Sequence, residues 1–464
     1  MSRQLIRSIS SRKEALDLLS RHLVDQKSIP AIFLDGQEWG NIPKHGQIQE
    51  HNQSESKSPC SKILFLGFSA WLEFHNGVAR VYVEDGSPTS AIYQEDSDSY
   101  SDSSHWIHKE IIDEIERCSD PWKALELFRR STPGYHAGYL SYELKNYREN
   151  LVSENPDPLP LPELWIGSPR KVIQIEEEAE QNPQINSKGS LSTRILERNP
   201  SITEAEYVNM VDSAKKKIHD GDYYEINLSV LFSGVFEGDP MQLYRKISYE
   251  GSQPFSAYVN TGKIQICSAS PERFLCKMGD QLYSSPMKGT AARAHDPKND
   301  SLNKKRLQES EKERAENLMI VDLVRNDFSR VCRAGTVKVN PLFEINSYPT
   351  VHQMISTVNG QLKTSVSPEE VIASCFPMGS MTGAPKITAL RDIERLESYR
   401  RGVYSGAIGY FSPDHDFDFS VVIRTAFCQE DGTFIYPAGS AITSDADPLQ
   451  EWKEILLKTE VLSR

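Results

Sequence analysis

Two pairs of glutamates with helical spacing are the first residues in the sequence that could do chemistry. Glu313 and Glu316 lie three residues apart, and residues with this spacing share one face of a helix. Glu451 and Glu454 repeat the spacing near the end of the chain, and Lys458 falls on the same face. Two such helices could hold one hard divalent cation, and Mg²⁺ suits a site with few carboxylates and several waters. Such pairs also occur on solvated helices, so an exposed salt-bridge face is the open alternative.

A lone lysine in a turn is the second candidate. Lys288 lies in the segment Pro286-Met-Lys-Gly-Thr290. Gly289 lets the backbone approach a ligand, and its N–H and that of Thr290 could bind a carboxylate. As a nucleophile Lys288 would have to be neutral, which requires a pKa well below the ordinary 10.4. Burial or a nearby cation could lower the pKa. A surface lysine in a turn is the alternative.

The helices that must carry these residues are indicated by caps and by periodicity. Residues 448–462 are predicted to be a helix that begins after Asp447 as the N-cap. A long charged helix is predicted over 301–327. Another is predicted over 201–220, where a capping box begins at Thr203 and apolar residues recur at helical intervals.

Short apolar or alternating runs predict the strands. Runs of strands are interrupted by helices without regular alternation, which favours an α+β fold with large antiparallel sheets and helices on the outside. The predicted strands are 31–34, 63–68, 78–83, 138–142, 224–232, 264–268, 274–277, 406–411, 420–426 and 433–436.

The chain divides into three regions by composition. Residues 1–165 hold short apolar runs, with an acidic, serine-rich loop predicted at 95–102. Residues 166–200 are predicted to be a linker or mobile loop, because most of this stretch is polar and poor in aromatic residues. Residues 201–464 carry every candidate residue named above and are predicted to be the catalytic domain.

Composition and charge exclude several classes of protein. The net charge of −13 argues against a nucleic-acid binder, which needs a basic face. No apolar stretch reaches the roughly 20 residues that cross a bilayer, and the first residues lack the apolar core of a signal peptide. The seven cysteines are widely spaced, which predicts reduced thiols in a cytoplasmic protein.

Several separated blocks, in a fixed order, resemble the chorismate-utilising enzymes, and most closely the aminodeoxychorismate synthases among them. Each block alone is weak, but the ordered set is specific and covers residues from about 200 to 462. Residues 1–165 resemble the family's N-terminal domain, as in anthranilate synthase component I, through the stretch 138–142, and the first 130 match loosely. The blocks are 221–228, 270–274, 286–290, 314–323, 376–386, 404–407, 423–424 and the helix with Glu451, Glu454 and Lys458.

The resemblance implies a magnesium-dependent site for chorismate. Mg²⁺ would bind the ring carboxylate, with Glu316 and Glu454 as the more direct ligands and Glu313 and Glu451 acting through water. The substrate-binding residues that the resemblance implies are Gly289, Thr290 and Lys458 near the ring carboxylate, Tyr404 and Arg424 at the enolpyruvyl carboxylate, and Gly439 in a glycine-rich loop.

The resemblance also implies the reaction. Lys288 would attack C2 of chorismate while Glu272, as general acid, protonates the departing C4 hydroxyl. Ammonia would then attack C4 and expel the lysine, giving 4-amino-4-deoxychorismate for para-aminobenzoate and folate biosynthesis. An alanine at position 288 is typical of relatives that act at C2. A buried glutamate paired with Arg273 is the open alternative for Glu272.

The sequence departs from the family pattern at three places. Glu225 stands where isochorismate-type enzymes have a lysine and many aminating relatives have glutamine, and its role is open. Gln353 replaces a histidine associated with pyruvate elimination, which favours a product that keeps the enolpyruvyl group. Ser440 and Ala441 replace glycines in the loop around Gly439.

The source of ammonia is the remaining requirement. Glutamine amidotransferases carry a nucleophilic cysteine in a G-x-C-x-G turn, and none of the seven cysteines has that setting. A separate glutaminase subunit is therefore the expected partner, with free ammonium as the other source of nitrogen.

Two alternative functions stay open: an anthranilate synthase large subunit that releases pyruvate, and a catalytically silent homologue that binds chorismate. The complete set of candidate residues speaks against the second.

Overall fold

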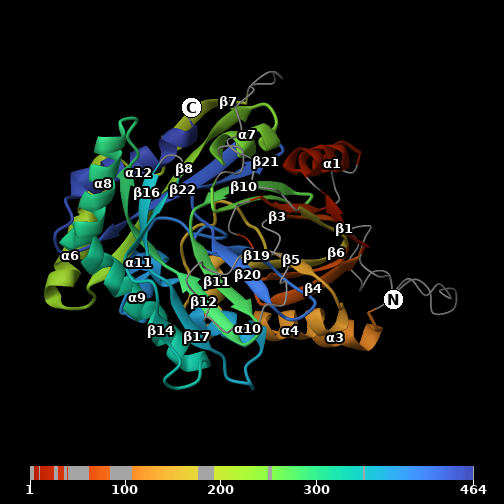
Figure 1. Cartoon of the computed structure of the whole chain (residues 1–464). Coiled ribbons are helices and arrows are strands. Elements are labelled where there is room, and N and C mark those ends of the chain that lie inside the picture. The colour runs from red at the N-terminus through yellow and green to blue at the C-terminus, as the bar shows by residue number, and fades with distance from the viewer. Residues whose placement is uncertain are drawn as a thin grey trace, which may run out of the picture.

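The computed structural model describes residues 5–9, 11–25, 30–35, 39, 62–83, 107–175, 193–248, 253–348 and 351–462. Nineteen strands in this part of the chain form one continuous, almost entirely antiparallel sheet, and helices lie around its outside (Figure 1). A second sheet has three strands, β13 (Met287–Ala292), β15 (Glu344–Ser347) and β16 (Val351–Ile355). The predicted α+β class is confirmed.

The large sheet joins the first third of the chain to the rest. Strand β2 (Ala31–Leu34) pairs with β3 (Lys62–His75) on one side and with β9 (Phe255–Asn260) on the other. Strand β5 (His136–Leu140) pairs with β19 (Ala407–Phe411) in the same way. The sheet is therefore continuous across the boundaries predicted at residues 165 and 200.

The linker predicted over 166–200 is wrong at both of its ends. Strand β6 (Leu164–Ile175) is largely buried and pairs with β3. Strand β7 (Arg194–Pro200) pairs with β8 (Glu225–Glu237). Most of its residues are exposed and four of the seven are polar, which explains why composition suggested a linker. Residues 176–192, and the loop predicted at 95–102, lie outside the described residues.

Most predicted strands are confirmed, and one is divided. The predicted strand over 420–426 is two strands, β20 (Phe417–Val421) and β21 (Thr425–Gln429). Between them Arg424 has a left-handed backbone with φ of 51°. The remaining strands are β1 (Leu5–Ile9), β4 (Val78–Val83), β10 (Ile264–Ser270), β11 (Arg273–Met278), β12 (Gln281–Ser285), β14 (Lys338–Val339), β17 (Val358–Gln361), β18 (Gly383–Ala384) and β22 (Thr433–Ile442).

The helix caps predicted from sequence are present. In α6 (Glu204–Asp220) the capping box at Thr203 is complete. In α12 (Pro448–Thr459) the Asp447 side chain accepts a hydrogen bond from the N–H of Gln450 at 2.9 Å. A 3₁₀ turn over Glu460–Leu462 follows α12.

The predicted helix over 301–327 is two helices, α8 (Pro297–Glu309) and α9 (Glu311–Val331). Ser310 separates them, because its hydroxyl accepts a hydrogen bond from the N–H of Glu313 and caps a new helix. The other helices are α1 (Arg12–Asp25), α3 (Lys109–Glu116), α4 (Pro121–Ser131), α5 (Asn146–Glu149), α7 (Pro240–Ile247), α10 (Pro368–Cys375) and α11 (Lys386–Leu396), with 3₁₀ turns at Tyr142–Lys145 and Gly379–Met381.

An apolar cluster on one side of the sheet fixes helix α12. Trp452 and Ile455 of α12 are buried in this cluster, and the Trp452 ring lies 5.3 Å from the ring of Tyr207 on α6. Full burial of such side chains stabilises the fold by about 2–3 kcal/mol each. This packing turns the face that carries Glu451 and Glu454 away from the core.

The described residues contain no helix that is both long and apolar enough to span a membrane. The six cysteines among them are free thiols. A cytoplasmic location stays a prediction.

Arg401 joins three separate elements through a buried network. Its guanidinium pairs with Glu397 at 2.6 Å and donates hydrogen bonds to the carbonyl oxygens of Met381 and Asn227, at 2.6 and 2.8 Å. Both members of the ion pair are about 1% exposed. Breaking a buried pair leaves an uncompensated charge, which is strongly destabilising.

We expect Arg401→Met to lower the free energy of unfolding by about 3–5 kcal/mol, measured by urea denaturation. Arg395→Met is the matched control, because Arg395 also pairs with a neighbouring carboxylate, that of Asp392, but is 58% exposed. The control should change stability by about 0.5 kcal/mol or less. Equal losses in the two variants would contradict the role given to the buried network.

Candidate active site

Lys288 is held by two carboxylates from different elements. Its Nζ lies 2.8 Å from Oε1 of Glu225, the first residue of β8, and 3.7 Å from Oε2 of Glu316 on α9. The Lys288 side chain is 14% exposed, so it is not the surface lysine that the turn alone would allow. The sequence predicted Lys288 and Glu316 but left the role of Glu225 open.

The pKa of Lys288 is shifted in the direction opposite to the one predicted. Burial lowers it, but the negative charges of Glu225 and Glu316 outweigh burial and raise it above the ordinary value. The predicted lowering is therefore wrong for the protein by itself. In this arrangement Lys288 is an ammonium ion within an acidic pocket.

Glu225 also has an oxygen without a partner. Oε2 of this buried glutamate makes no hydrogen bond within the described residues. The departure from the family pattern at position 225 was the signal in the sequence, but the sequence could not show that the residue faces Lys288.

Gln353, the second departure from the family pattern, is also buried. It lies opposite Thr290 in the register of β16 and β13, and Thr290 itself is exposed.

Glu272 lies in the turn between β10 and β11 and is 6% exposed. Burial raises the pKa of its carboxyl to about 7, while the Ser380 side chain and the charges of Lys288 and Arg424 oppose the shift. A carboxyl that titrates near neutral pH can deliver a proton, as a general acid must. The alternative partner Arg273 pairs instead with Asp418 at 3.0 Å.

The predicted glycine turn packs directly against α9. Gly289 has φ of 84°, and a Cβ built there would lie 2.8 Å from Oε2 of Glu313. Burial, together with the charges of Glu313 and Glu225, raises the pKa of Glu316, while Lys288 lowers it. The two α9 carboxylates therefore repel each other beside the lysine.

The α12 carboxylates have partners on their own side of the site. Glu451 accepts a hydrogen bond from the Ser440 hydroxyl. Glu454 pairs with Lys458 at 2.6 Å, and Lys458 donates to the carbonyl oxygen of Gly439 at 2.8 Å. Burial and the charge of Glu454 raise the pKa of Glu451. The pKa of Glu454 is lowered despite burial, because Lys458 is in contact with it.

The four carboxylates are not gathered into one ligand cluster. No three His, Cys, Asp or Glu side chains of the described residues lie close enough to hold a metal. The two helices nevertheless lie within electrostatic reach of each other, because the charge of Lys312 on α9 lowers the pKa values of Glu451 and Glu454 on α12. Mg²⁺ commonly takes only one or two carboxylates with several waters, so the donor chemistry fits this ion.

Tyr404 and Gly439 lie close together, whereas the pairing predicted from the sequence was that of Tyr404 with Arg424. A Cβ at Gly439 would lie 2.9 Å from the Tyr404 hydroxyl and 2.8 Å from Oδ1 of Asn227, so glycine keeps this approach open. Tyr404 is buried. Arg424 is half-buried in the break between β20 and β21, near enough for its charge to act on Glu272.

Known proteins resemble this chain over much of its length. A family model described as chorismate binding enzyme matches residues 78–464. The chain is 42% identical to a chloroplastic aminodeoxychorismate synthase of Arabidopsis thaliana, over 60% of this chain and 30% of that protein. It is 38% identical to aminodeoxychorismate synthase component 1 of Escherichia coli, over 55% of this chain and 56% of that protein. The chain thus spans about half or less of the length of these relatives.

A solved structure of anthranilate synthase component I from Streptococcus pneumoniae has the same fold. The TM-score is 0.68 at 25% identity, and the match covers 90% of this chain and 95% of that one. A match over 90% of this chain includes most of its first third as well as the remainder.

The raised pKa of Glu272 makes stability depend on pH. The folded protein keeps a proton on this carboxyl up to about pH 7, whereas an unfolded glutamate loses it near 4.5. Stability from this residue is therefore present below pH 4.5 and is lost as the pH rises to 7. We expect the free energy of unfolding of Glu272→Gln to rise by about 2–3 kcal/mol relative to that of the original protein between pH 5 and pH 8. Urea unfolding of both proteins across this range measures the difference. A difference in free energy of unfolding that does not change with pH would contradict the raised pKa of Glu272.

Proposed function

The chain belongs to the family of chorismate binding enzymes, and from this membership we propose that it aminates chorismate at C4 to give 4-amino-4-deoxychorismate. The observation that carries the proposal is the half-buried Lys288, held by Glu225 and Glu316 with its charge acting on Glu272. The relatives of 42% and 38% identity that carry the name aminodeoxychorismate synthase support the same reading.

The first half of the reaction uses Lys288 and Glu272. The Lys288 amine attacks C2, both double bonds of the ring diene shift by one position, and the C4–O bond breaks. Glu272 gives its proton to the departing hydroxyl, which leaves as water. Lys288 must first lose a proton, and the Glu225 carboxylate at 2.8 Å is a direct acceptor. The product is a protonated secondary amine that joins Lys288 to C2.

The second half restores both residues. Ammonia attacks C4, both ring double bonds shift back, and the C2–N bond breaks with its electron pair remaining on the lysine nitrogen. Because that nitrogen is protonated in the adduct, Lys288 leaves as a neutral amine. The new C4 ammonium gives one proton to the Glu272 carboxylate. Two displacements explain why the nitrogen arrives at C4.

Carboxylates on α9 and α12 are the proposed magnesium ligands. Glu316 and Glu454 would hold the ion, with Glu313 and Glu451 acting through water. When bound, Mg²⁺ supplies positive charge for the ring carboxylate of the substrate. Repulsion between Glu313 and Glu316, and between Glu451 and Glu454, supports the assignment, because a cation would relieve it.

A separate glutaminase subunit is the proposed source of ammonia. The designation of the E. coli relative as component 1 supports this assignment.

Amination at C2 with release of pyruvate is the second candidate function, because the fold matches that of an anthranilate synthase component. Lys288 favours C4, and identification of the product separates the two.

Lys288→Ala should remove the first displacement while Glu272 and the carboxylates remain. We expect formation of 4-amino-4-deoxychorismate to fall at least about a hundredfold, because covalent catalysis contributes several kcal/mol. With ammonia withheld, the original protein should form an adduct of substrate mass on the peptide that contains Lys288, detected by mass spectrometry.

Lys277→Ala is the matched control, because Lys277 is a half-buried lysine paired with Asp416 outside the site. The Lys277→Ala variant should form 4-amino-4-deoxychorismate at the original rate and should still form the adduct on Lys288. A near-normal rate and unchanged product in Lys288→Ala would refute the nucleophile role.

Removal of Mg²⁺ by a chelator should abolish turnover, because the carboxylates would then repel the dianionic substrate. Glu454→Gln should raise the Mg²⁺ concentration needed for half-maximal activity by about tenfold or more. Glu460→Gln, a change at an exposed glutamate after the same helix, should leave it unchanged. Full activity of Glu454→Gln in chelator would overturn the metal assignment.

A further inference from the structure

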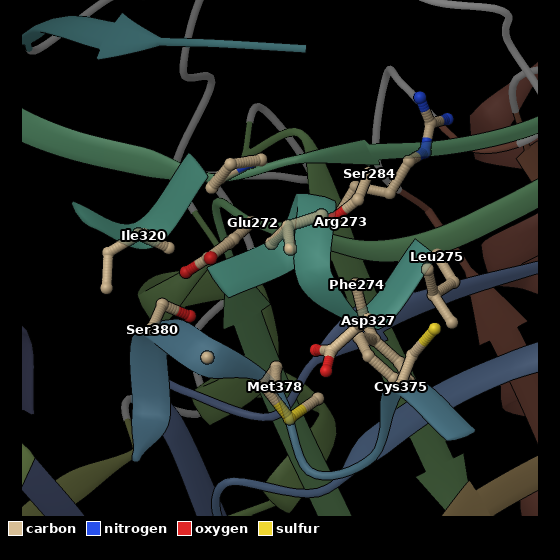
Figure 2. Close-up of a pocket in the computed structure, with 13 residues that line it drawn as sticks. Glu272, Arg273, Phe274, Leu275, Ser284, Ile320, Asp327, Cys375, Met378 and Ser380 are labelled. Atoms are coloured by element: carbon tan, nitrogen blue, oxygen red, sulfur yellow. The ribbon is translucent and has the colours of Figure 1, made fainter. Parts of the chain in front are cut away.

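A small cavity adjoins Glu272 on the inner side of α9. Its volume is about 20 Å³, and a cavity needs about 10–15 Å³ on this measure to hold one water. Glu272 and Ser380 lie together at one side of it, and Asp327 lies toward Cys375 at another (Figure 2). The space therefore suits one molecule of the size of water or ammonia.

Asp327 presents an acceptor that the protein leaves unsatisfied. The residue is 3% exposed, and its Oδ2 accepts a hydrogen bond from Lys386 at 2.7 Å. Its Oδ1 is buried and has no hydrogen-bond partner within the described residues. A buried acceptor without a donor is costly, so a donor molecule in the cavity would be favoured.

The remaining walls are mainly apolar. Ile320 and Val324 come from α9, Leu275 from β11, and Met378 from the segment after α10. An ammonium ion would lose its hydration there. Of the two carboxyl groups at the cavity, Asp327 is already paired with Lys386, and burial raises the pKa of Glu272 to about 7, so neither compensates an ammonium ion well. Neutral ammonia, with three N–H donors and one lone pair, is the better occupant.

Asp327 also lines a second, larger hollow. This groove of about 610 Å³ runs between α9 and α11 and includes Leu323 and Lys386. The Leu323 side chain packs against Gly379, where a Cβ would come within 2.6 Å. The Asp327–Lys386 pair and Leu323 thus stand between the groove and the cavity.

We propose that the cavity beside Glu272 binds ammonia and that the groove between α9 and α11 is its entrance. This inference rests on the proposed amination of chorismate. Bound ammonia donates to Oδ1 of Asp327 and keeps its lone pair for C4. Bond formation to C4 breaks the C2–N bond to Lys288, and Glu272 takes the proton that the new amine releases.

The test fills the cavity without touching a polar residue. Val324→Leu adds one methylene to a residue that lines the cavity, while Val321→Leu adds the same group to a buried valine of α9 that lines neither hollow. The purified chain is assayed with chorismate, Mg²⁺ and ammonium chloride at fixed pH. Trapping of the Lys288 adduct without ammonium reports the first half-reaction separately.

We expect Val324→Leu to raise the KM for ammonium at least tenfold. The KM for chorismate and the yield of adduct should stay within about twofold, and Val321→Leu should leave all three unchanged. An unchanged KM for ammonium in Val324→Leu, or equal effects in both variants, would overturn the inference and show that water alone occupies the cavity. Absence of turnover in the original protein would instead overturn the proposed function, and the ammonia site with it.

A second variant keeps the test decisive if Val324→Leu does not fold. Val324→Ala enlarges the cavity, so methylamine should become a better nucleophile relative to ammonia, read as the fraction of product heavier by one methylene. An unchanged ratio of the two products would also overturn the inference.

Discussion

The charge balance around one half-buried lysine is the constraint on which the rest of the site depends. Lys288 lies between Glu225 and Glu316, and these carboxylates keep it protonated although it is mostly removed from water. A lysine so held is well positioned but unreactive. Its reactivity must then come from a change in its surroundings, such as substrate binding or proton transfer to Glu225. In the proposed mechanism, Lys288 would therefore become a nucleophile only when the substrate is present.

The scaffold makes this balance possible by bringing rigid elements together from distant parts of the chain. Glu225 is the first residue of β8. This strand pairs with β22 along ten residues, and Gly439 of β22 is one of the paired residues. Helix α12 is fixed on the same side by Trp452 in the apolar cluster. Arg401 adds hydrogen bonds to carbonyl oxygens on β8 and in the 3₁₀ turn before β18. The glutamates of the site, which repel one another, are therefore held in place by sheet pairing, apolar packing and the Arg401 network, none of which involves their own carboxylates.

The sequence predicted features whose causes are local and missed those whose causes are distant. The caps at Thr203 and Asp447 were predictable, because each depends on a side chain and a backbone N–H three residues away. The break at Ser310 was missed because charged residues of helical type continue on both sides of it. The left-handed backbone at Arg424 was missed because only glycine signals such a conformation reliably. The order of motifs identified the family and Lys288, but the contact with Glu225 is tertiary, and no local pattern encodes it.

Two buried carboxylates face the same small cavity, and their different partners give them different chemistry. Burial raises the pKa of both Glu272 and Asp327. Asp327 is in direct contact with Lys386, which favours its ionised form and makes it an acceptor. Glu272 faces the neutral hydroxyl of Ser380 and titrates near pH 7, which allows it to give a proton and take one back. The proposed amination of C4 would use both properties at adjacent positions: an acceptor that orients the incoming nitrogen, and an acid that is regenerated when the nitrogen has bonded.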